Sequence, residues 1–269
     1  MVTLDALGQT TDYAKTYDWK VLEAIPRAAS RASLAAGINL TRGVDVWHLF
    51  EVSYLDPTGK PVACTARLTV PSSSPNICES KSLKLYIGSL NFSVFESEEA
   101  LIKQVQDDLY RVIKARVKFE LLSLDALSPS LLDAAHCLDH LPITLSDKDA
   151  DASLLKYAGE SRVFEQLHTH LFRSHCPVTA QPDWATVQLV YRGRAIDHAA
   201  LLSYLVSYRS HSGFHESCVE QIFTDLLSRL KPDALMVRAL FTRRGGIDIN
   251  PARATTDDLL PGPLRLTRQ

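Results

Sequence analysis

The fold is decided by the stretch Val46-Trp-His-Leu-Phe-Glu-Val-Ser-Tyr-Leu55, the turn Asp56-Pro-Thr-Gly59 and the stretch Val62-Ala-Cys-Thr-Ala-Arg-Leu-Thr-Val70. Apolar and polar residues alternate in the first stretch, as they do in a half-buried strand. Asp, Pro and Gly favour a tight turn between two strands. These residues therefore predict a long antiparallel hairpin.

Helical and extended segments follow this hairpin. The segment Lys84–Ile87 looks extended. Ser97 is a suitable N-cap residue, and the two glutamates after it favour the positive end of a helix dipole. The apolar stripe of that helix comprises Ile102, Val105, Leu109, Val112 and Ile113. A strand is expected over Val117–Leu124, and a short helix near Trp19–Ile25.

The second half of the chain repeats this order. It predicts a strand over Ala185–Tyr191, a turn at Arg192-Gly193, helices over Ile196–Tyr208 and Glu216–Leu230, a strand over Leu235–Thr242 and a basic turn at Arg243-Arg-Gly-Gly246. Antiparallel hairpins beside segregated helices favour an α+β fold over a parallel α/β fold. A Ser-, Asp- and Leu-rich stretch ending near Asp151 looks like an interdomain connection. We therefore expect two similar modules, 1–140 and 141–269.

Composition excludes several classes of protein. The 269 residues are 46% apolar and 22% charged, and the formal net charge is −2, which gives no general attraction to nucleic acid or anionic membrane. No apolar run approaches the ~20 residues that span a bilayer, and the N-terminal residues do not resemble a secretory signal. The five cysteines are widely spaced and odd in number, which favours a reducing cytoplasm over a disulfide framework.

One proline-bounded segment combines a thiol with a carboxylate: Cys176-Pro-Val-Thr-Ala-Gln-Pro-Asp183-Trp184. A thiolate is a strong nucleophile at neutral pH, although a cation, a helix terminus or a base is needed to favour it. Asp183 cannot favour the thiolate by its charge, so its expected role is proton transfer. That role suits a carboxyl whose pKa is raised by burial against Trp184 or another apolar wall.

Other residues suggest ligand binding. His215 and Glu216 open a strongly periodic helix. A glutamate there is most often a first-turn residue favoured by the helix dipole. If a ligand binds there, the carboxylate can accept two adjacent N–H donors, as from a guanine-like base. The basic segments around Lys81 and around Arg243-Arg244-Gly245-Gly246 are suited to phosphate, since glycine permits close backbone approach.

A cluster of His168, His170, His175 and Cys176 raises the question of zinc. Catalytic zinc takes three protein ligands and leaves one position open. The spacing here matches no standard zinc finger, so we expect no metal in the site.

Four motifs in a fixed order resemble the NADPH-dependent 7-cyano-7-deazaguanine reductases of queuosine biosynthesis. They are Glu79-Ser-Lys-Ser-Leu-Lys-Leu-Tyr86, the Cys176–Trp184 segment, Phe214-His-Glu-Ser-Cys-Val-Glu220 and Thr242-Arg-Arg-Gly-Gly-Ile-Asp-Ile-Asn-Pro251. Because Glu-Ser-Lys precedes the cysteine, the chain resembles the longer, two-domain type. The opening Leu7-Gly-Gln-Thr-Thr-Asp-Tyr-Ala-Lys-Thr-Tyr17 and Val44-Asp-Val-Trp47 also resemble that type.

The resemblance implies tandem tunnelling-fold modules, with antiparallel sheets and helices packed on one face, assembling as a homodimer. It implies that NADPH reduces a nitrile to a primary amine through a covalent thioimide on Cys176, with Asp183 moving protons. The deazaguanine would contact Cys78, Glu79, Ser80, His215 and Glu216. The residues that match NADPH-contacting positions are Ser80, Lys81, Arg244 and Gly245.

Two other classes of function stay open at this stage. One is a zinc-dependent purine or pterin hydrolase, for which stoichiometric metal on Cys176 would be diagnostic. The other is a non-catalytic nucleobase- or RNA-binding module, although the chain lacks the aromatic and basic stripes typical of RNA binding. A small-molecule deazapurine nitrile, with no direct contact to nucleic acid or membrane, is the expected partner.

Overall fold

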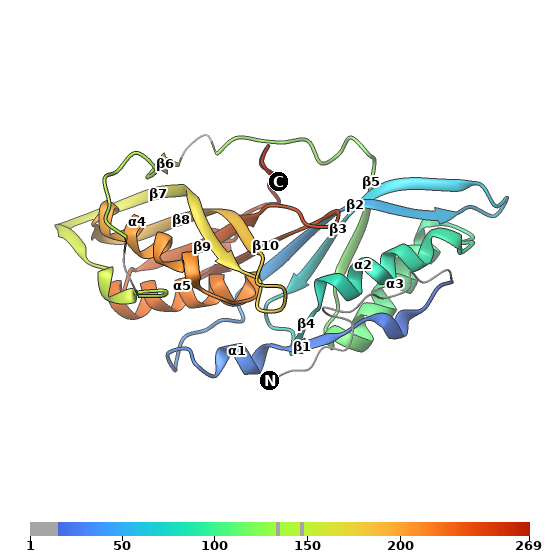
Figure 1. Cartoon of the computed structure of the whole chain (residues 1–269), viewed down its shortest axis with the longest axis horizontal. Coiled ribbons are helices and arrows are strands. Elements are labelled where there is room, and N and C mark those ends of the chain that lie inside the picture. The colour runs from blue at the N-terminus through green and yellow to red at the C-terminus, as the bar shows by residue number, and fades with distance from the viewer. Residues whose placement is uncertain (1–15, 133–134, 146–147) are drawn as a thin grey trace.

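A computed structural model describes residues 16–132, 135–145 and 148–269 of the chain. The opening motif Leu7–Tyr17 lies almost entirely outside these residues. One layer of strands runs through the molecule, with the helices on one side of it and the long connection after residue 122 on the other (Figure 1). Among the helices described, none is both long and apolar enough to cross a bilayer.

The main sheet has eight strands in the order β5-β3-β2-β10-β9-β8-β7-β6. Neighbouring strands are antiparallel except β6 and β7, which are parallel. In that order, the strands are β5 (Lys118–Leu122), β3 (Pro61–Pro71), β2 (Gly43–Leu55), β10 (Ile247–Ala254), β9 (Ala234–Phe241), β8 (Pro182–Ile196), β7 (Tyr157–His175) and β6 (His136–Cys137). A separate small sheet pairs β1 (Ala24–Pro26) with β4 (Asn76–Cys78).

The α-helices are α1 (Arg27–Arg31), α2 (Ser80–Ser89), α3 (Glu98–Ile113), α4 (His198–Val206) and α5 (His215–Leu230). Short 3₁₀-helices cover Trp19–Val21, Leu90–Phe92, Ala152–Leu154, Ser207–Ser210 and Asp257–Leu259. In each half a long hairpin is followed by two helices and then by further strand, so the predicted α+β class with helices on one face of an antiparallel sheet is confirmed.

The predicted first hairpin is β2 and β3. At its turn, Asp56 Oδ1 accepts the N–H of Thr58 at 2.9 Å, and Gly59 takes a φ of +81°, which suits glycine. The helix predicted after Ser97 is α3, and the Ser97 hydroxyl accepts the N–H of Ala100 at 3.2 Å. The Ser97 hydroxyl therefore sets the start of α3, and the Asp56 carboxylate sets the turn of the hairpin, each through a local hydrogen bond.

Two predictions about local structure were wrong, and one predicted helix begins two residues later than expected. Lys84–Ile87 is not extended but lies within α2, because the Glu79 carboxylate caps that helix. Arg192-Gly193 is not a turn: β8 continues through it to Ile196, and Gly193 packs against Pro232 too closely for a side chain. The helix expected over Ile196–Tyr208 begins at His198, after Asp197 caps it by accepting the N–H of Ala200.

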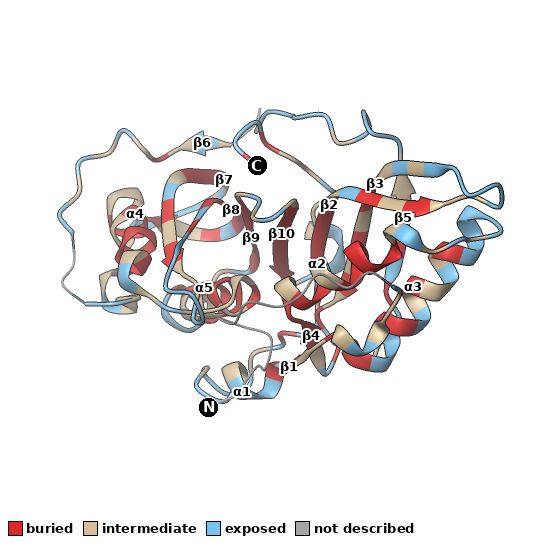
Figure 2. Cartoon of the chain, turned by 45° about the vertical axis from the view of Figure 1, so that its right-hand side comes forward, coloured by how far each residue is buried: buried red, intermediate tan, exposed pale blue. Residues whose placement is uncertain are grey.

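Each half has its own hydrophobic core between sheet and helices, and Figure 2 shows buried residues concentrated in the central strands. The last long strand joins the two halves. β10 pairs with β2 and β9, and its Ile247 and Ile249 pack into the core of the first half. The predicted boundary between residues 140 and 141 stays a prediction.

A buried ionic network reinforces this junction. Arg253 of β10 bonds Asp45 of β2 and Glu220 of α5, each at 2.7 Å, and Arg253 is fully buried. Arg27 of α1 pairs with Asp45 at 2.5 Å. Buried charges need such partners because desolvating an unpaired charge is costly. The network therefore fixes α5 and α1 against the centre of the sheet.

Candidate active site

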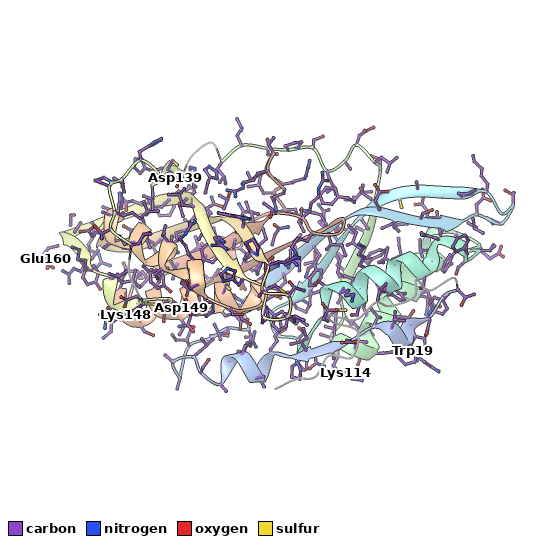
Figure 3. All side chains as sticks on the ribbon, in the orientation of Figure 1. Trp19, Lys114, Asp139, Lys148, Asp149 and Glu160 are labelled. Atoms are coloured by element: carbon purple, nitrogen blue, oxygen red, sulfur yellow. The ribbon has the colours of Figure 1, made fainter. Side chains whose placement is uncertain are left out.

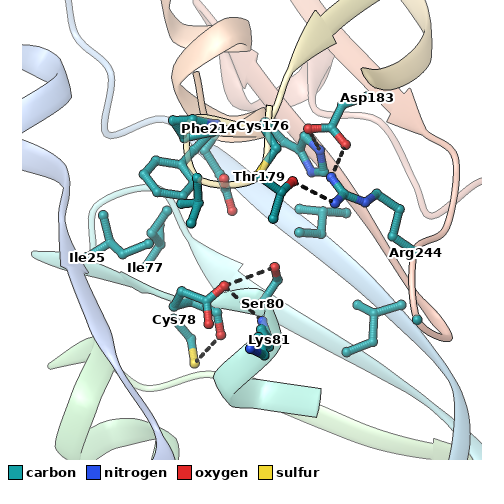
Figure 4. A pocket seen from close by; sticks show the side chains of 18 of the residues that line it. Ile25, Ile77, Cys78, Ser80, Lys81, Cys176, Thr179, Asp183, Phe214 and Arg244 are labelled. Atoms are coloured by element: carbon teal, nitrogen blue, oxygen red, sulfur yellow. Dashed lines mark hydrogen bonds and ion pairs between the residues drawn. The ribbon is translucent and has the colours of Figure 1, made fainter. Parts of the chain in front are cut away.

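A cavity of about 460 Å³ opens where the two halves meet. Its walls are the β7–β8 turn, the N-terminal ends of α2 and α5, and the β9–β10 turn (Figure 4). All ten residues predicted for the site line it: Cys78, Glu79, Ser80, Lys81, Cys176, Asp183, His215, Glu216, Arg244 and Gly245. Segments far apart in the sequence thus form one site, although the role of each residue is a separate question.

Cys176 begins the turn between β7 and β8. Its N–H donates to the Gln181 carbonyl at 2.9 Å, its carbonyl accepts from Ala180 at 3.0 Å, and Ala180 adopts a left-handed φ of +53°. The thiol is partly exposed to the cavity. Burial would lower the pKa of Arg244, but Asp183 and, to a smaller extent, the Cys176 sulfur outweigh burial and raise that pKa. A cation beside the sulfur is the kind of neighbour that activates a cysteine.

Asp183 is 4% exposed and faces two basic side chains. Arg244 Nη1 donates to Asp183 Oδ1 at 2.6 Å, and His215 Nε2 lies 3.4 Å from Asp183 Oδ2. Burial alone would raise the pKa of Asp183, but His215 and Arg244 outweigh it and hold the pKa below its usual value. Asp183 is therefore ionised at neutral pH.

The expectation of a raised pKa at Asp183 was wrong for a structural reason. Successive residues of a strand point to opposite faces, so Trp184 on β8 does not cover its neighbour. Trp184 is 38% exposed, and the guanidinium groups of Arg173 and Arg209 lie over its ring. Asp183 therefore meets cations where an apolar wall was expected.

Two residues missed by the sequence analysis position Arg244. Its Nη2 donates to Thr179 Oγ1 at 3.2 Å and to Gln181 Oε1 at 3.0 Å (Figure 4). Both residues belong to the Cys176–Asp183 segment, so one turn holds the thiol, the carboxylate and the arginine together. Their polar character within that segment was the sequence signal that could have identified these two residues. Their partner, Arg244, lies in the β9–β10 turn and is distant in the sequence.

Glu216 is 3% exposed in the first turn of α5. Burial, together with a smaller effect of the nearby Asp45 carboxylate, raises the pKa of Glu216 to about 7. Its Oε1 atom is buried without a hydrogen-bond partner among the described residues. His215 stacks on Phe241, with ring centroids 3.9 Å apart. The sequence predicted that both residues bind a ligand, whereas in the structure His215 also contacts Asp183.

Glu79 is equally buried but has its oxygens occupied. They accept the N–H groups of Lys81 at 2.9 Å and Ser82 at 2.7 Å, which caps α2. Cys78 beside it is 2% exposed, and burial raises the pKa of the Cys78 thiol to about 12. Although both line the cavity, their main contacts are structural.

The basic segments meet at one wall. Gly245 has a φ of +60°, and a Cβ there would lie 2.9 Å from Lys84 Nζ. The N-terminal end of α2, which carries Ser80 and Lys81, is thereby brought to the β9–β10 turn. This arrangement suits phosphate groups, because Lys81, Lys84 and Arg244 line the same wall of the cavity.

Trp47 is a further lining residue that the sequence analysis assigned no role. It is 2% exposed, and its indole N–H has no hydrogen-bond partner among the described residues. Unsatisfied buried donors are uncommon in native proteins. Trp47 Nε1 and Glu216 Oε1 therefore offer a ligand one donor and one acceptor. This role of Trp47 was not predictable from the sequence, because an apolar residue in a strand normally belongs to the hydrophobic core.

The histidine cluster considered for zinc is divided. His168 and His170 group with Cys137 of β6, with ligand atoms all within 4.8 Å. His175 instead contacts Arg173 Nη2 at 2.9 Å. No group of three potential ligands within the described ranges contains Cys176.

Two family models match the chain. "Nitrile reductase, 7-cyano-7-deazaguanine-reductase N-term" matches residues 13–121, and "QueF-like protein" matches residues 182–258. A crystal structure of the archaeosine synthase QueF-Like in the apo form has 17% sequence identity and a TM-score of 0.31, covering 36% of this chain and 94% of that one, and no argument rests on it.

Curated relatives match nearly the whole chain. The NADPH-dependent 7-cyano-7-deazaguanine reductases of Acinetobacter baumannii (strain SDF) and Acinetobacter baylyi are each 46% identical, covering 98% of this chain and 97% of theirs. That of Chromohalobacter salexigens is 45% identical, covering 98% of this chain and 96% of its own. On this similarity, the chain belongs to the NADPH-dependent 7-cyano-7-deazaguanine reductase family.

Proposed function

We propose that the protein uses NADPH to reduce the nitrile of 7-cyano-7-deazaguanine to the amine of 7-aminomethyl-7-deazaguanine, in the biosynthesis of the tRNA nucleoside queuosine. The observation that carries this function is the grouping in one cavity of Cys176, Asp183 and Arg244 with Glu216, whose buried Oε1 has no hydrogen-bond partner within the described part of the chain. A nucleophile at one wall and a base-binding carboxylate at another suit an electrophile carried on a heterocycle.

Recognition of the base falls to Glu216. The ring N–H and exocyclic amine of a guanine-type base are adjacent donors, and a carboxylate accepts both. Such donors supply the partner that Glu216 Oε1 lacks and favour its ionised form. The indole N–H of Trp47 is available to an acceptor such as the ring carbonyl oxygen. Base binding thus satisfies two polar groups whose burial is otherwise uncompensated.

Cys176 carries the covalent step. Its thiol proton passes to the ionised Asp183, and Arg244 stabilises the sulfur anion that remains. The sulfur then bonds to the nitrile carbon, a π pair of the C≡N bond moves to nitrogen, and Asp183 returns the proton to that nitrogen. The product is a thioimide, whose carbon accepts hydride more readily than a nitrile carbon does. His215 holds Asp183 throughout by its 3.4 Å contact.

The residues at the basic wall fit NADPH. Lys84 lies against Gly245, and Lys84, Lys81 and Arg244 supply positive charge for phosphate groups. When bound, NADPH supplies the hydrides for a four-electron reduction. Ser80 lies in the first turn of α2 and lines the same cavity.

Turnover and adduct formation test the function separately. Purified protein is expected to oxidise NADPH only when 7-cyano-7-deazaguanine is present, with about two NADPH consumed per amine formed, as a four-electron reduction requires. Without NADPH, mass spectrometry should show one ligand-sized adduct on the peptide that contains Cys176. Turnover without any adduct would contradict the covalent step, and an adduct on Cys78 would contradict the residue assignment.

A homodimer in the cytoplasm completes the proposal. All five cysteines are free, as suits a reducing compartment. In the described chain β6 pairs with Leu167 and His168 of β7, so much of that 19-residue edge strand is open to a second copy. Phe164 near this edge is 61% exposed. Light scattering should give a dimer for the wild type and a monomer for Phe164→Glu; a wild-type monomer would contradict the assembly.

A further inference from the structure

A second side-chain cluster lies at one edge of the sheet, on β6 and on the part of β7 that precedes the Cys176 turn. Cys137 of β6 and His168 and His170 of β7 place one ligand atom each within 4.8 Å of one another. Figure 3 shows Asp139, two residues after Cys137, beside β6 and β7 on the side of the sheet opposite α5. The reductase chemistry proposed above uses none of these residues.

The strand geometry explains why the three side chains converge. Residues at i and i+2 of a strand point to the same face, which places His168 and His170 side by side, with ring centroids 5.0 Å apart. Cys137 pairs directly with His168 across the parallel β6–β7 ladder. The β7 register shifts between Thr169 and Phe172, and such a bulge re-aims side chains.

Asp139 holds the bulge in place. Its carboxylate accepts the Thr169 hydroxyl at 2.6 Å and the His170 N–H at 3.1 Å. It also brings negative charge close to the cluster. Arg268 bonds the His170 carbonyl oxygen at 2.8 Å, and its charge opposes a cation, so the Asp139 charge offsets it. A thiolate at Cys137 would leave the cluster favourable to a divalent ion.

Each histidine has one ring nitrogen engaged and one available. His170 Nδ1 contacts the buried Thr186 hydroxyl at 2.8 Å, which leaves Nε2. His168 hydrogen-bonds the backbone of Ala135, while its Nδ1 is buried without a partner among the described residues. The His168 side chain is only 8% exposed. Metal-binding histidines are typically oriented in this way, with the second nitrogen bonded to a hydroxyl, a carboxylate or a backbone carbonyl.

We propose that Cys137, His168 and His170 form a zinc site whose fourth position faces solvent. One thiolate and two imidazoles are a donor set that zinc prefers over magnesium or calcium. At the usual bond lengths of tetrahedral zinc, such ligand atoms lie about 3.3–3.6 Å apart. Side-chain movements of about 1 Å therefore bring the three atoms to these distances. His168 and His170 also line a cavity of about 560 Å³, which gives room for a water or an exogenous ligand. The ion would fasten the two-residue strand β6 to the edge of β7.

Metal uptake by the full-length protein tests the site. Chelator-treated wild type is to be titrated with Co²⁺ and with Zn²⁺, following the thiolate-to-cobalt charge-transfer band and the zinc content by mass spectrometry. One equivalent per chain is expected, with the band present. Cys137→Ser should abolish the band, and His170→Ala should weaken affinity by about 10²-fold or more, since even outer-sphere partners are worth 10–100-fold.

Cys176→Ala is the matched control, because it also removes a partly exposed thiol that borders a polar cavity. It should bind cobalt like the wild type. Thr186→Val, which removes only the hydroxyl behind His170, should weaken metal affinity without removing a ligand. Retention of reductase turnover by Cys137→Ser shows that this variant is folded.

Two outcomes would overturn the proposal. One is wild-type protein that takes up no zinc when mixed with an equimolar micromolar concentration. The other is a cobalt band that survives Cys137→Ser and disappears in Cys176→Ala, which would move the metal to the catalytic thiol. Both outcomes are independent of whether the protein reduces nitriles, because they are read from metal binding alone.

Discussion

Each half of the molecule brings one cysteine and one neighbouring carboxylate to the same cavity, and the two pairs differ sharply. Cys78 and Glu79 are both buried, the thiol has a pKa of about 12, and the carboxylate caps α2. Cys176 is partly exposed, and Asp183 faces Arg244 and His215. The same two residue types thus serve structure in one half and reactivity in the other.

The difference teaches that access and counter-charge, and not residue identity, select the reactive pair. Burial raises the pKa of the Cys78 thiol, whereas the Cys176 thiol is partly exposed on the wall that also carries Arg244. The carboxylates of the two halves differ in their hydrogen-bond and ion-pair partners for a related reason. Glu79 is satisfied by backbone N–H groups, while Glu216 remains unsatisfied and Asp183 is held ionised by cations.

Replacing each of the two thiols by alanine gives the largest expected difference in turnover. Cys176→Ala should lower turnover by about 10⁴-fold or more, as loss of a nucleophile does in covalent catalysis. Cys78→Ala is the matched control: it should keep most of the activity and cost about 1 kcal/mol of stability through the small cavity left behind. Steady-state NADPH oxidation and urea unfolding measure these effects. A Cys78→Ala variant that is stable but inactive would break the comparison.

Asp183→Asn should lower kcat by about 10²-fold or more, the usual effect of losing an acid–base group. Its KM should change little, because Glu216 still binds the base. A general loss of structure would raise KM and lower the melting temperature as well, so the kcat-to-KM split separates the two causes. A near-normal kcat would remove Asp183 from proton transfer.

Glu216→Gln compares the unsatisfied carboxylate with the satisfied one. Loss of a charged hydrogen bond should weaken base binding by about 10–100-fold. Folding raises the pKa of Glu216 from 4.5 to about 7. The folded protein therefore binds this proton more tightly than the unfolded chain does, and that stabilisation is lost as the pH rises through 7.

Relative to wild type, the Gln variant should thus gain stability on going from pH 5 to pH 8, measured by urea unfolding. The gain is on the order of a few kcal/mol at most. Glu79→Ala is the control. It should lose about 1 kcal/mol at both pH values, because it removes a helix cap. If the stabilities of the two variants changed equally with pH, the contrast between Glu216 and Glu79 would be contradicted.

The smallest expected effect is a shift in pH dependence. Arg244→Met removes one of the two cations that lower the pKa of Asp183, so the acid limb of kcat/KM should move upward by about 1 pH unit. Arg243→Met is the matched control, because the Arg243 guanidinium lies 4.7 Å from the Phe50 ring and not at Asp183. Identical profiles for both variants would exclude Arg244 as the group that keeps Asp183 ionised.

Strong local signals made part of the fold predictable. The β2–β3 hairpin, α3 and α5 follow from alternation, a serine cap and a helical apolar stripe. α2 was missed because its cap is Glu79, a residue type outside the usual capping set. Likewise Gly193 suggested a turn, although its lack of a side chain serves close packing against Pro232.

The membership of the site was predictable from its motifs, but its electrostatics were not. Arg244 lies 61 residues beyond Asp183 and reaches it only because β8 and β9 pair. Asp45 perturbs Glu216 from 171 residues away in the sequence. Local sequence carries no information about such pairs, so the sign of the pKa shift at Asp183 was predicted wrongly.

The position of β10 in the middle of the sheet has a consequence for synthesis of the protein. Ile247 pairs with Leu49, so the central ladder joins residues separated by almost the whole chain. Until β10 has been synthesised, the hairpin formed early has an unpaired edge at β2, and unpaired strand edges favour aggregation. The catalytic cavity therefore forms only after the β9–β10 hairpin has been synthesised, because its turn is one wall of that cavity.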